Sequence, residues 1–181
     1  IYAREGFVIV TLAWIGISVG GALPFWISGA IPAFADALFE AVSGFTTTGS
    51  SILTDVERLP ESLLFWRSFT HWIGGMGVLV FVMAIIPLGG SRSMHLLRAE
   101  SPGPEVGKLV PRMGSSAKIL YGIYIVFTVA EAVLLMLGGV PVLDSFILTF
   151  GTVGTGGFSP KNASVAAYNS AYVDAVVTVF M

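Results

Sequence analysis

The sequence contains no cysteine and very little charge. The absence of cysteine excludes disulfide bonds and thiolate metal sites. Only 11% of the residues are charged and 55% are hydrophobic, whereas an ordinary soluble domain has about 25% charged residues. The sequence also lacks the basic stripe that a nucleic-acid-binding surface requires. This composition is typical of a protein embedded in a lipid bilayer.

Long stretches of the chain have no formal charge at all. Residues 6–35 and 68–91 contain no Asp, Glu, Lys or Arg, and each exceeds the roughly 20 residues that a membrane-spanning helix needs. A third apolar stretch, residues 119–143, is interrupted only by Glu131, and a fourth begins near Ala171. We therefore expect four spans, the last one incomplete. Without a signal peptide at the start, both ends are expected to be internal to a longer protein.

Positive charge is concentrated in the linker between the second and third spans. Five of the nine Lys and Arg residues lie there, so by the positive-inside rule this linker faces the cytoplasm. The segments at residues 28–61 and 141–172 are then outside. The expected organisation is a first repeat at 1–90, a basic cytoplasmic linker at 91–117, and a second repeat at 118–181 whose last helix is truncated.

Each outer segment contains an apolar stretch that is too short to cross a bilayer. At 1.5 Å per residue, residues 33–45 and 144–153 do not reach across about 30 Å of hydrocarbon. We interpret each as a re-entrant half-helix, and the alternative is an amphipathic surface helix. Asp36 and Asp144 fall in their first turns, where a carboxylate can cap free N–H groups.

The two outer segments are related by a spacing of 108 residues. This offset pairs the two aspartates, and it also pairs Thr47 with Thr155 and Gly49 with Gly157. Each preceding span is expected to end at a Gly-Gly pair followed by proline (Gly20, Gly21 and Pro24; Gly138, Gly139 and Pro141). The chain is therefore predicted to be a tandem repeat of span, half-helix, polar loop and span.

A polar, glycine-rich loop follows each half-helix, at residues 46–51 and 154–159. Irregular backbone at membrane depth is tolerated only where it is buried in protein or lines a water-filled cavity. Such loops can direct backbone carbonyls and Thr hydroxyls toward an axis, where they replace the hydration shell of a cation. The half-helix directs its negative C-terminal end toward the same place. The loops therefore predict a cation pore, and a plain outer turn is the alternative.

At these loops the chain resembles a known family. Residues 40–50, followed by residues 71–77, resemble the first repeat of the Trk/Ktr/HKT superfamily and specifically its bacterial potassium-uptake branch, and residues 151–159 resemble the second filter loop. The resemblance implies an all-α integral membrane fold with four tandem helix, pore-loop, helix repeats around one pore, as in potassium channels. This chain would hold two of the four. The glycines at both matching filter positions favour potassium over sodium.

The resemblance also implies which residues bind the ion. The implied potassium ligands are backbone carbonyls in the two filter loops, from Thr47, Thr48, Gly49, Thr155, Gly156 and Gly157. The residues that flank them are Thr46, Ser50, Gly154 and Phe158. The implied transported ion is K⁺, with no covalent cofactor. The implied location is the bacterial inner membrane, and the implied partners are a second copy of the subunit and a cytosolic nucleotide-binding regulatory ring.

Three ionisable residues inside the predicted spans, Arg67, His71 and Glu131, are functional candidates without an assigned role. For Arg67, snorkelling to the interface explains the charge as well as a role in the pore does. His71 and Glu131 leave open an intramembrane enzyme with acid–base chemistry, although the internal duplication argues against it. A secondary transporter of another cation, coupled to sodium or protons, is the third hypothesis. The sequence determines neither coupling nor gating.

Overall fold

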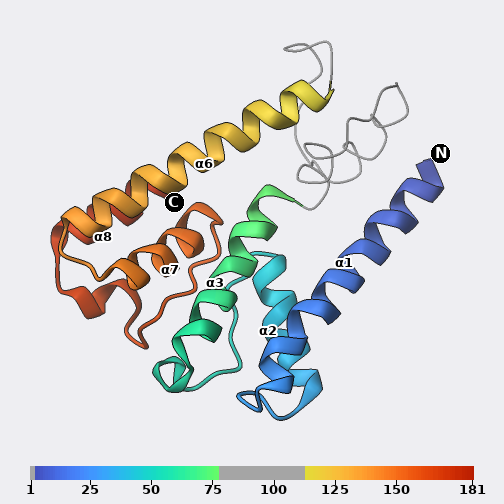
Figure 1. The fold of residues 1–181 in the computed structure, drawn as a ribbon, viewed down its shortest axis with the longest axis horizontal. Helices are drawn as coiled ribbons and strands as arrows, with labels where there is room; N and C mark the ends of the chain where they lie inside the picture. Colours follow the sequence, from blue (N-terminus) through green and yellow to red (C-terminus); the bar gives the residue numbers. More distant parts are fainter. Residues whose placement is uncertain (1–2, 78–112) are drawn as a thin grey trace. The chain divides into compact units, whose positions relative to one another are not determined.

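The computed structural model describes residues 3–77 and 113–181, so most of the predicted cytoplasmic linker at 91–117 lies outside the described residues. No strand occurs in the two described stretches, which confirms the predicted all-α fold (Figure 1). The α-helices are α1 (Ala3–Ile27), α2 (Phe34–Phe45), α3 (Glu61–Met76), α6 (Met113–Leu137), α7 (Val142–Val153) and α8 (Ala171–Phe180). Two short 3-10 helices, η1 (Val56–Arg58) and η3 (Ser164–Tyr168), lie in the outer segments.

The chain divides into two compact units. Of the described residues, one unit contains 3–17, 76–77 and 113–125, and the other contains 18–75 and 126–181. Both predicted half-helices and both glycine-rich loops belong to the second unit. The contacts between the two half-helices and their loops are therefore contacts within one unit.

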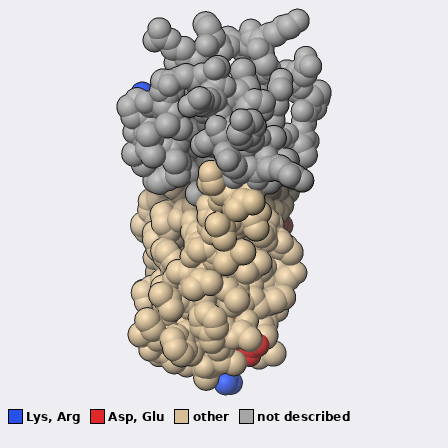
Figure 2. Space-filling view, turned by 90° about the vertical axis from the view of Figure 1, so that its right-hand side faces the viewer, with Lys and Arg blue, Asp and Glu red and all other residues tan. Residues whose placement is uncertain are grey.

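Helices α1 and α6 are long and apolar enough to cross a bilayer. Val8–Ile27 and Lys118–Leu137 have mean hydropathies of 1.9 and 2.1, and most of their side chains are not buried by the rest of the chain. In a membrane these side chains would face lipid, and Figure 2 shows a face whose described residues are almost all uncharged. The predicted second span begins within α3, but this helix ends at Met76, so only the first part of the span is helical among the described residues and the rest lies outside them. The predicted fourth span begins at Ala171, as expected.

The first two helices of each repeat have the same lengths in both repeats. Helices α2 and α7 are each 12 residues long, and adding 108 to either bound of α2 gives the corresponding bound of α7. Helices α1 and α6 are each 25 residues long. At 1.5 Å per residue, α2 and α7 reach only about 18 Å, which is too short to span the hydrocarbon. Both half-helices are therefore confirmed as short helices of equal length.

The predicted Gly-Gly-Pro exits are not equivalent. Gly20, Gly21 and Pro24 lie inside α1, because one proline does not end a helix whose other backbone hydrogen bonds persist. The two long helices instead end at matching turns. Gly29 and Gly139 have φ values of 73° and 83°, and the N–H of each donates to the carbonyl three residues earlier at 3.1 and 3.0 Å. Glycine adopts this left-handed conformation at little cost.

Gly21 has a packing role instead. A Cβ atom at Gly21 would collide with the ring of Phe45, the last residue of α2, whereas a Cβ at the neighbouring Gly20 would meet nothing within 4 Å. The Phe45 side chain is 1% exposed. The close approach of α1 to the end of α2 therefore depends on Gly21.

We expect Gly21→Ala to destabilise the protein and Gly20→Ala to stabilise it slightly, because alanine favours the helix more than glycine does. Overpacking a buried site costs about 1 to 3 kcal/mol, and the gain in helix propensity is the same for both variants. The melting temperatures of the two purified variants in detergent measure this difference. Equal melting temperatures would show that α1 does not pack on Phe45 as described.

Two apolar cores meet at α7. Ile147 belongs to a core formed with residues of α1, α2 and α3, and the adjacent Leu148 belongs to a core formed with residues of α6 and α8. Figure 1 accordingly shows α7 between α3 and the pair of α6 and α8. Because consecutive residues of an α-helix point about 100° apart, the second half-helix is buried on two faces, one against each repeat.

Candidate ion-binding loops

The loops that follow α2 and α7 have the same backbone conformation. Thr47 and Thr155 have φ values of 53° and 56°, and Gly49 and Gly157 have φ values of 75° and 82°. A threonine with positive φ is rare because a β-branched side chain crowds the backbone there. Its occurrence at the same place in both loops extends the repeat from the helices to the predicted filter residues.

The N–H groups of both loops are directed back to the ends of their helices. Thr47 and Thr48 donate to carbonyls in the last turn of α2 at 3.0 Å each. Thr155, Gly156 and Gly157 donate to carbonyls near the end of α7 at 2.7, 2.9 and 2.9 Å. In a planar trans peptide the C=O points opposite to the N–H of the next residue.

It follows that several loop carbonyls point away from the helix ends. These are the carbonyls of Thr46, Thr47, Gly154, Thr155 and Gly156, whose following N–H groups are all bonded to the helices. By contrast, the Ser50 carbonyl accepts a hydrogen bond from the Ser43 hydroxyl at 2.5 Å. The Ser50 carbonyl therefore faces α2.

The two loops touch each other through glycine. A Cβ atom at Gly49 would collide with the carbonyl oxygen of Gly156. Within the second loop, Gly156 lies against the imidazole ring of His71 of α3, and Gly154 lies against the His71 carbonyl oxygen. A side chain at Gly49 or Gly154 would have to move backbone, and one at Gly156 would have to displace the His71 ring, so the spacing of the loops depends on glycine at these positions.

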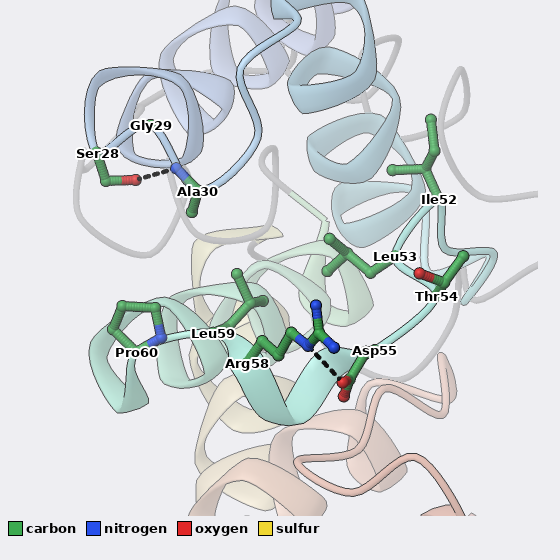
Figure 3. Close-up of a pocket in the computed structure, with 10 residues that line it drawn as sticks. All are labelled: Ser28, Gly29, Ala30, Ile52, Leu53, Thr54, Asp55, Arg58, Leu59 and Pro60. Carbon is green, nitrogen blue, oxygen red and sulfur yellow. Dashed lines mark hydrogen bonds and ion pairs between the residues drawn. The ribbon is translucent and has the colours of Figure 1, made fainter.

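Two cavities open on the outer segments. One of about 510 Å³ is lined by residues 28–30, 52–55 and 58–60, where Arg58 pairs with Asp55 at 2.9 Å (Figure 3). No filter glycine lines it. The other, of about 230 Å³, is lined by Gly49 and Gly157 and is open to the outside beside the loops. This smaller cavity is the one that adjoins the candidate site.

Glu40 anchors the chain that leaves the first loop. Its carboxylate is buried and accepts hydrogen bonds from the Ser51 hydroxyl at 2.9 and 3.1 Å and from the Ile52 N–H at 3.0 Å. It also pairs with Arg67 of α3 at 2.5 Å. Sequence reasoning missed this role. The available signal was a carboxylate on the buried face of α2, between Ala37 and Ala41.

Arg67 does not snorkel to the interface. Its side chain is 4% exposed, and α3 begins six residues before it, so that it lies within the helix rather than at its end. Its guanidinium carbon lies 3.4 Å from the centroid of the Phe158 ring. The His71 ring stacks on Phe158 with 3.8 Å between the centroids. Arg67 and His71 thus contact the second loop from α3, while Glu131 is fully buried on α6 and no role follows from its surroundings.

The outer segments of the two repeats are tied together by Asn162. Its side-chain oxygen accepts from the Val56 N–H at 2.8 Å, its side-chain nitrogen donates to Asp55 at 2.8 Å, and its N–H donates to Glu57 at 3.1 Å. The hydrogen bond from Asn162 is the main cause that lowers the pKa of Asp55 below its ordinary value of 3.8. Of the two half-helix aspartates, Asp144 accepts from the Tyr168 hydroxyl at 2.8 Å, and Asp36 lies half-buried in the first turn of α2.

The lowered pKa of Asp55 predicts a pH dependence of stability. Because the folded pKa lies below the unfolded value, the ionised carboxylate stabilises the fold above that value, and this contribution is lost as pH falls through the folded pKa. We expect the melting temperature of wild type to exceed that of Asp55→Asn at about pH 6, and the difference to shrink toward zero below about pH 3. A difference in melting temperature that does not change with pH would contradict the stabilising interaction of ionised Asp55 with Asn162.

The chain matches the family model described as "TrkH: Cation transport protein" over residues 1–181. It is 41% identical over 181 residues to the Trk system potassium uptake protein TrkH of Salmonella typhimurium, and 39% identical over 179 residues to TrkG of Escherichia coli. These matches cover 99% and 98% of this chain, which spans 38% and 37% of the relatives' lengths. The crystal structure of the potassium transporter TrkH from Vibrio parahaemolyticus matches with a TM-score of 0.79 and 35% identity, over 99% of this chain and 36% of that one.

These proteins carry out transport rather than catalysis, so the hypothesis of an intramembrane enzyme using His71 or Glu131 is excluded. The matched lengths agree with the expectation that a longer protein contains this tandem repeat. Together with the duplicated half-helices and loops, they show that this chain belongs to the TrkH family of cation transport proteins.

Proposed function

We propose that this chain supplies two of the four walls of a potassium-selective filter in a potassium uptake protein. The observation that carries the proposal is the identical backbone of the loops after α2 and α7, with positive φ at Thr47 and Gly49 and again at Thr155 and Gly157. Backbone carbonyls of these loops, with Thr hydroxyls beside them, replace the hydration shell of the ion. The proposed ligands are Thr47, Thr48, Gly49, Thr155, Gly156 and Gly157, flanked by Thr46, Ser50, Gly154 and Phe158.

The charge distribution supports a cation over an anion. Each loop begins directly after the C-terminal end of a half-helix, at Phe45 and Val153. That end of a helix carries about half a negative charge. The same ends accept the loop N–H groups, so the dipoles that remain directed at the ion are carbonyl oxygens. A cation that has lost its water is stabilised by both.

The chain on its own is half of such a filter. Thr46, Thr48, Ser50, Thr155 and Gly157 of the two loops are exposed in the described structure. In a four-repeat protein the exposed surface of the loops would face the third and fourth loops across the ion path. We therefore expect residues 1–181 expressed alone to give no selective conduction.

Rubidium uptake tests the proposal. The full-length protein would be expressed in bacteria that lack their own potassium uptake, and entry of tracer Rb⁺ would be measured with K⁺ or Na⁺ as competitor. We expect K⁺ to compete at much lower concentration than Na⁺, because the carbonyl sites fit the larger dehydrated ion. Equal competition by the two ions would favour the alternative, a transporter of another cation coupled to sodium or protons.

Assembly forms part of the same proposal. We propose a homodimer of the full-length subunit in the bacterial inner membrane, with a cytosolic nucleotide-binding regulatory ring at its inner face. The five basic residues between the second and third spans support such a contact, although anionic lipid headgroups would attract the same charges. Cross-linking from the basic linker at 91–117 distinguishes the two, since only a protein partner gives a cross-linked species of higher mass.

A further inference from the structure

We propose that Arg67 is a positioning residue that holds the second filter loop in place relative to the first. The inference rests on the proposed filter and adds to it a side chain that contacts the second loop directly and the first loop through Glu40. Arg67 lies on α3, outside both loops. The family resemblance assigns roles to residues of the loops and none to Arg67. Three contacts support the inference: Arg67 bonds Glu40, Arg67 lies over the Phe158 ring, and His71 stacks on the same ring.

Glu40 fixes Arg67 to the first loop. The Glu40 carboxylate is held by the chain that leaves this loop, through the Ser51 hydroxyl and the Ile52 N–H, and it accepts from Arg67 Nε at 2.5 Å. Both charged side chains are buried, at 0% and 4% exposure. A charge-assisted hydrogen bond in this setting is strong and directional. The guanidinium plane therefore has a fixed orientation relative to the first loop.

Phe158 connects the guanidinium to the second loop. The guanidinium carbon lies 3.4 Å from the centroid of the Phe158 ring, and Nη1 approaches the Ser159 carbonyl oxygen at 3.5 Å. A guanidinium over an aromatic face is attracted by the ring quadrupole, more strongly when water is excluded. Phe158 follows the filter residue Gly157 directly. A shift of this ring would therefore be transmitted to the filter.

His71 packs against the other face of the Phe158 ring. His71, one helical turn after Arg67, stacks on Phe158 with 3.8 Å between centroids and 18° between planes. Two groups that close to one centroid cannot occupy the same volume, so they lie on opposite faces of the ring. The Phe158 backbone is also confined, because a Cβ at Gly151 would collide with its carbonyl oxygen. Phe158 is thus held between two side chains of α3.

The stability of a buried ion pair does not by itself explain this arrangement. Replacing such a pair with apolar residues of similar volume is often neutral or stabilising. The two contacts require a planar cation, which donates to Glu40 from one edge and lies over the Phe158 ring. The ammonium group of lysine is not planar and does not meet this requirement. The requirement is explained if the spacing of the two loops determines which ion fits between them.

The test uses the full-length protein and two readouts, the amount of folded protein in the membrane and the K⁺ over Na⁺ preference of Rb⁺ uptake. We expect Arg67→Lys to fold and to lose preference by about tenfold or more, because small misplacements of a site are costly. The double variant Glu40→Gln with Arg67→Met leaves no unpaired buried charge. It should give about the wild-type amount of folded protein and still lack the preference. Arg58→Lys is the control, since its side chain is 86% exposed and away from the loops.

Wild-type preference in Arg67→Lys, or restored preference in the double variant, would overturn the inference. A purely structural role would lower the folded amount and leave the preference of the remaining protein unchanged, which also overturns it. If the proposed function itself is wrong, the outcome is different: the wild-type protein would not distinguish K⁺ from Na⁺, and the variants would have no preference to lose.

Discussion

Replacing Gly49 by alanine is expected to abolish potassium-selective uptake. Two costs combine at this position. The φ of 75° is unfavourable for any residue with a Cβ by about 1 to 2 kcal/mol. The added methyl would also collide with the carbonyl oxygen of Gly156 in the other loop, which must then move. Because that carbonyl is a proposed ligand, both loops are displaced by one substitution.

Two further glycines separate these costs. Gly29 has nearly the same φ, 73°, but a Cβ there meets nothing within 4 Å and the residue lies outside the loops. Gly157 has a φ of 82° in the second loop, and its nearest atom is Met181 Cε at 3.9 Å. In Rb⁺ uptake with Na⁺ competition we expect wild-type preference for Gly29→Ala, partial loss for Gly157→Ala and complete loss for Gly49→Ala. Equal loss in all three would mean that backbone strain alone is responsible.

Truncating Glu40 is expected to cause a large loss of stability. Glu40→Ala leaves the Arg67 guanidinium buried without its carboxylate and frees the Ser51 and Ile52 donors. Breaking a buried pair in this way costs about 3 to 5 kcal/mol. The expected result is a strong drop in the melting temperature of the purified protein and in the folded amount in membranes.

A matched comparison shows whether the cost comes from the unpaired charge. Adding Arg67→Met to Glu40→Ala removes that charge and should recover much of the lost stability. At the surface, Arg58→Ala breaks the exposed pair with Asp55 and is expected to cost far less, since exposed pairs contribute little to stability. A Glu40→Ala variant no less stable than Arg58→Ala would contradict the buried network.

The sequence predicts the half-helices well because their signals are local. A short apolar stretch, an aspartate near its start and a glycine-rich polar run after it define each half-helix within about 20 residues. The observed bounds of α2 and α7 lie within two residues of the predicted ones. The offset of 108 was visible for the same reason. The Gly-Gly-Pro comparison failed because a glycine pair looks the same whether it ends a helix or admits a neighbouring side chain, and Gly21 does the latter.

The contacts between the repeats could not be predicted in the same way. The pair of Glu40 and Arg67 joins residues 27 apart, and Arg67 approaches Phe158 from 91 positions earlier in the chain. No sequence period links such residues, and a single charge in an apolar span fits a snorkelling side chain equally well. Burial of the charge decides between these explanations, and burial depends on how α2, α3 and α7 pack. The same holds for Asn162, whose partners lie on the other repeat.

The central claim is that the loops at residues 46–50 and 154–158 together bind a dehydrated potassium ion. The most direct measurement is the anomalous scattering of Rb⁺ or Tl⁺ in crystals of the full-length protein. We predict an anomalous peak on the pore axis, within coordination distance of carbonyl oxygens from both loops, which Na⁺ displaces poorly. A peak that contacts neither loop, or one that Na⁺ displaces as readily as K⁺ does, would contradict the account.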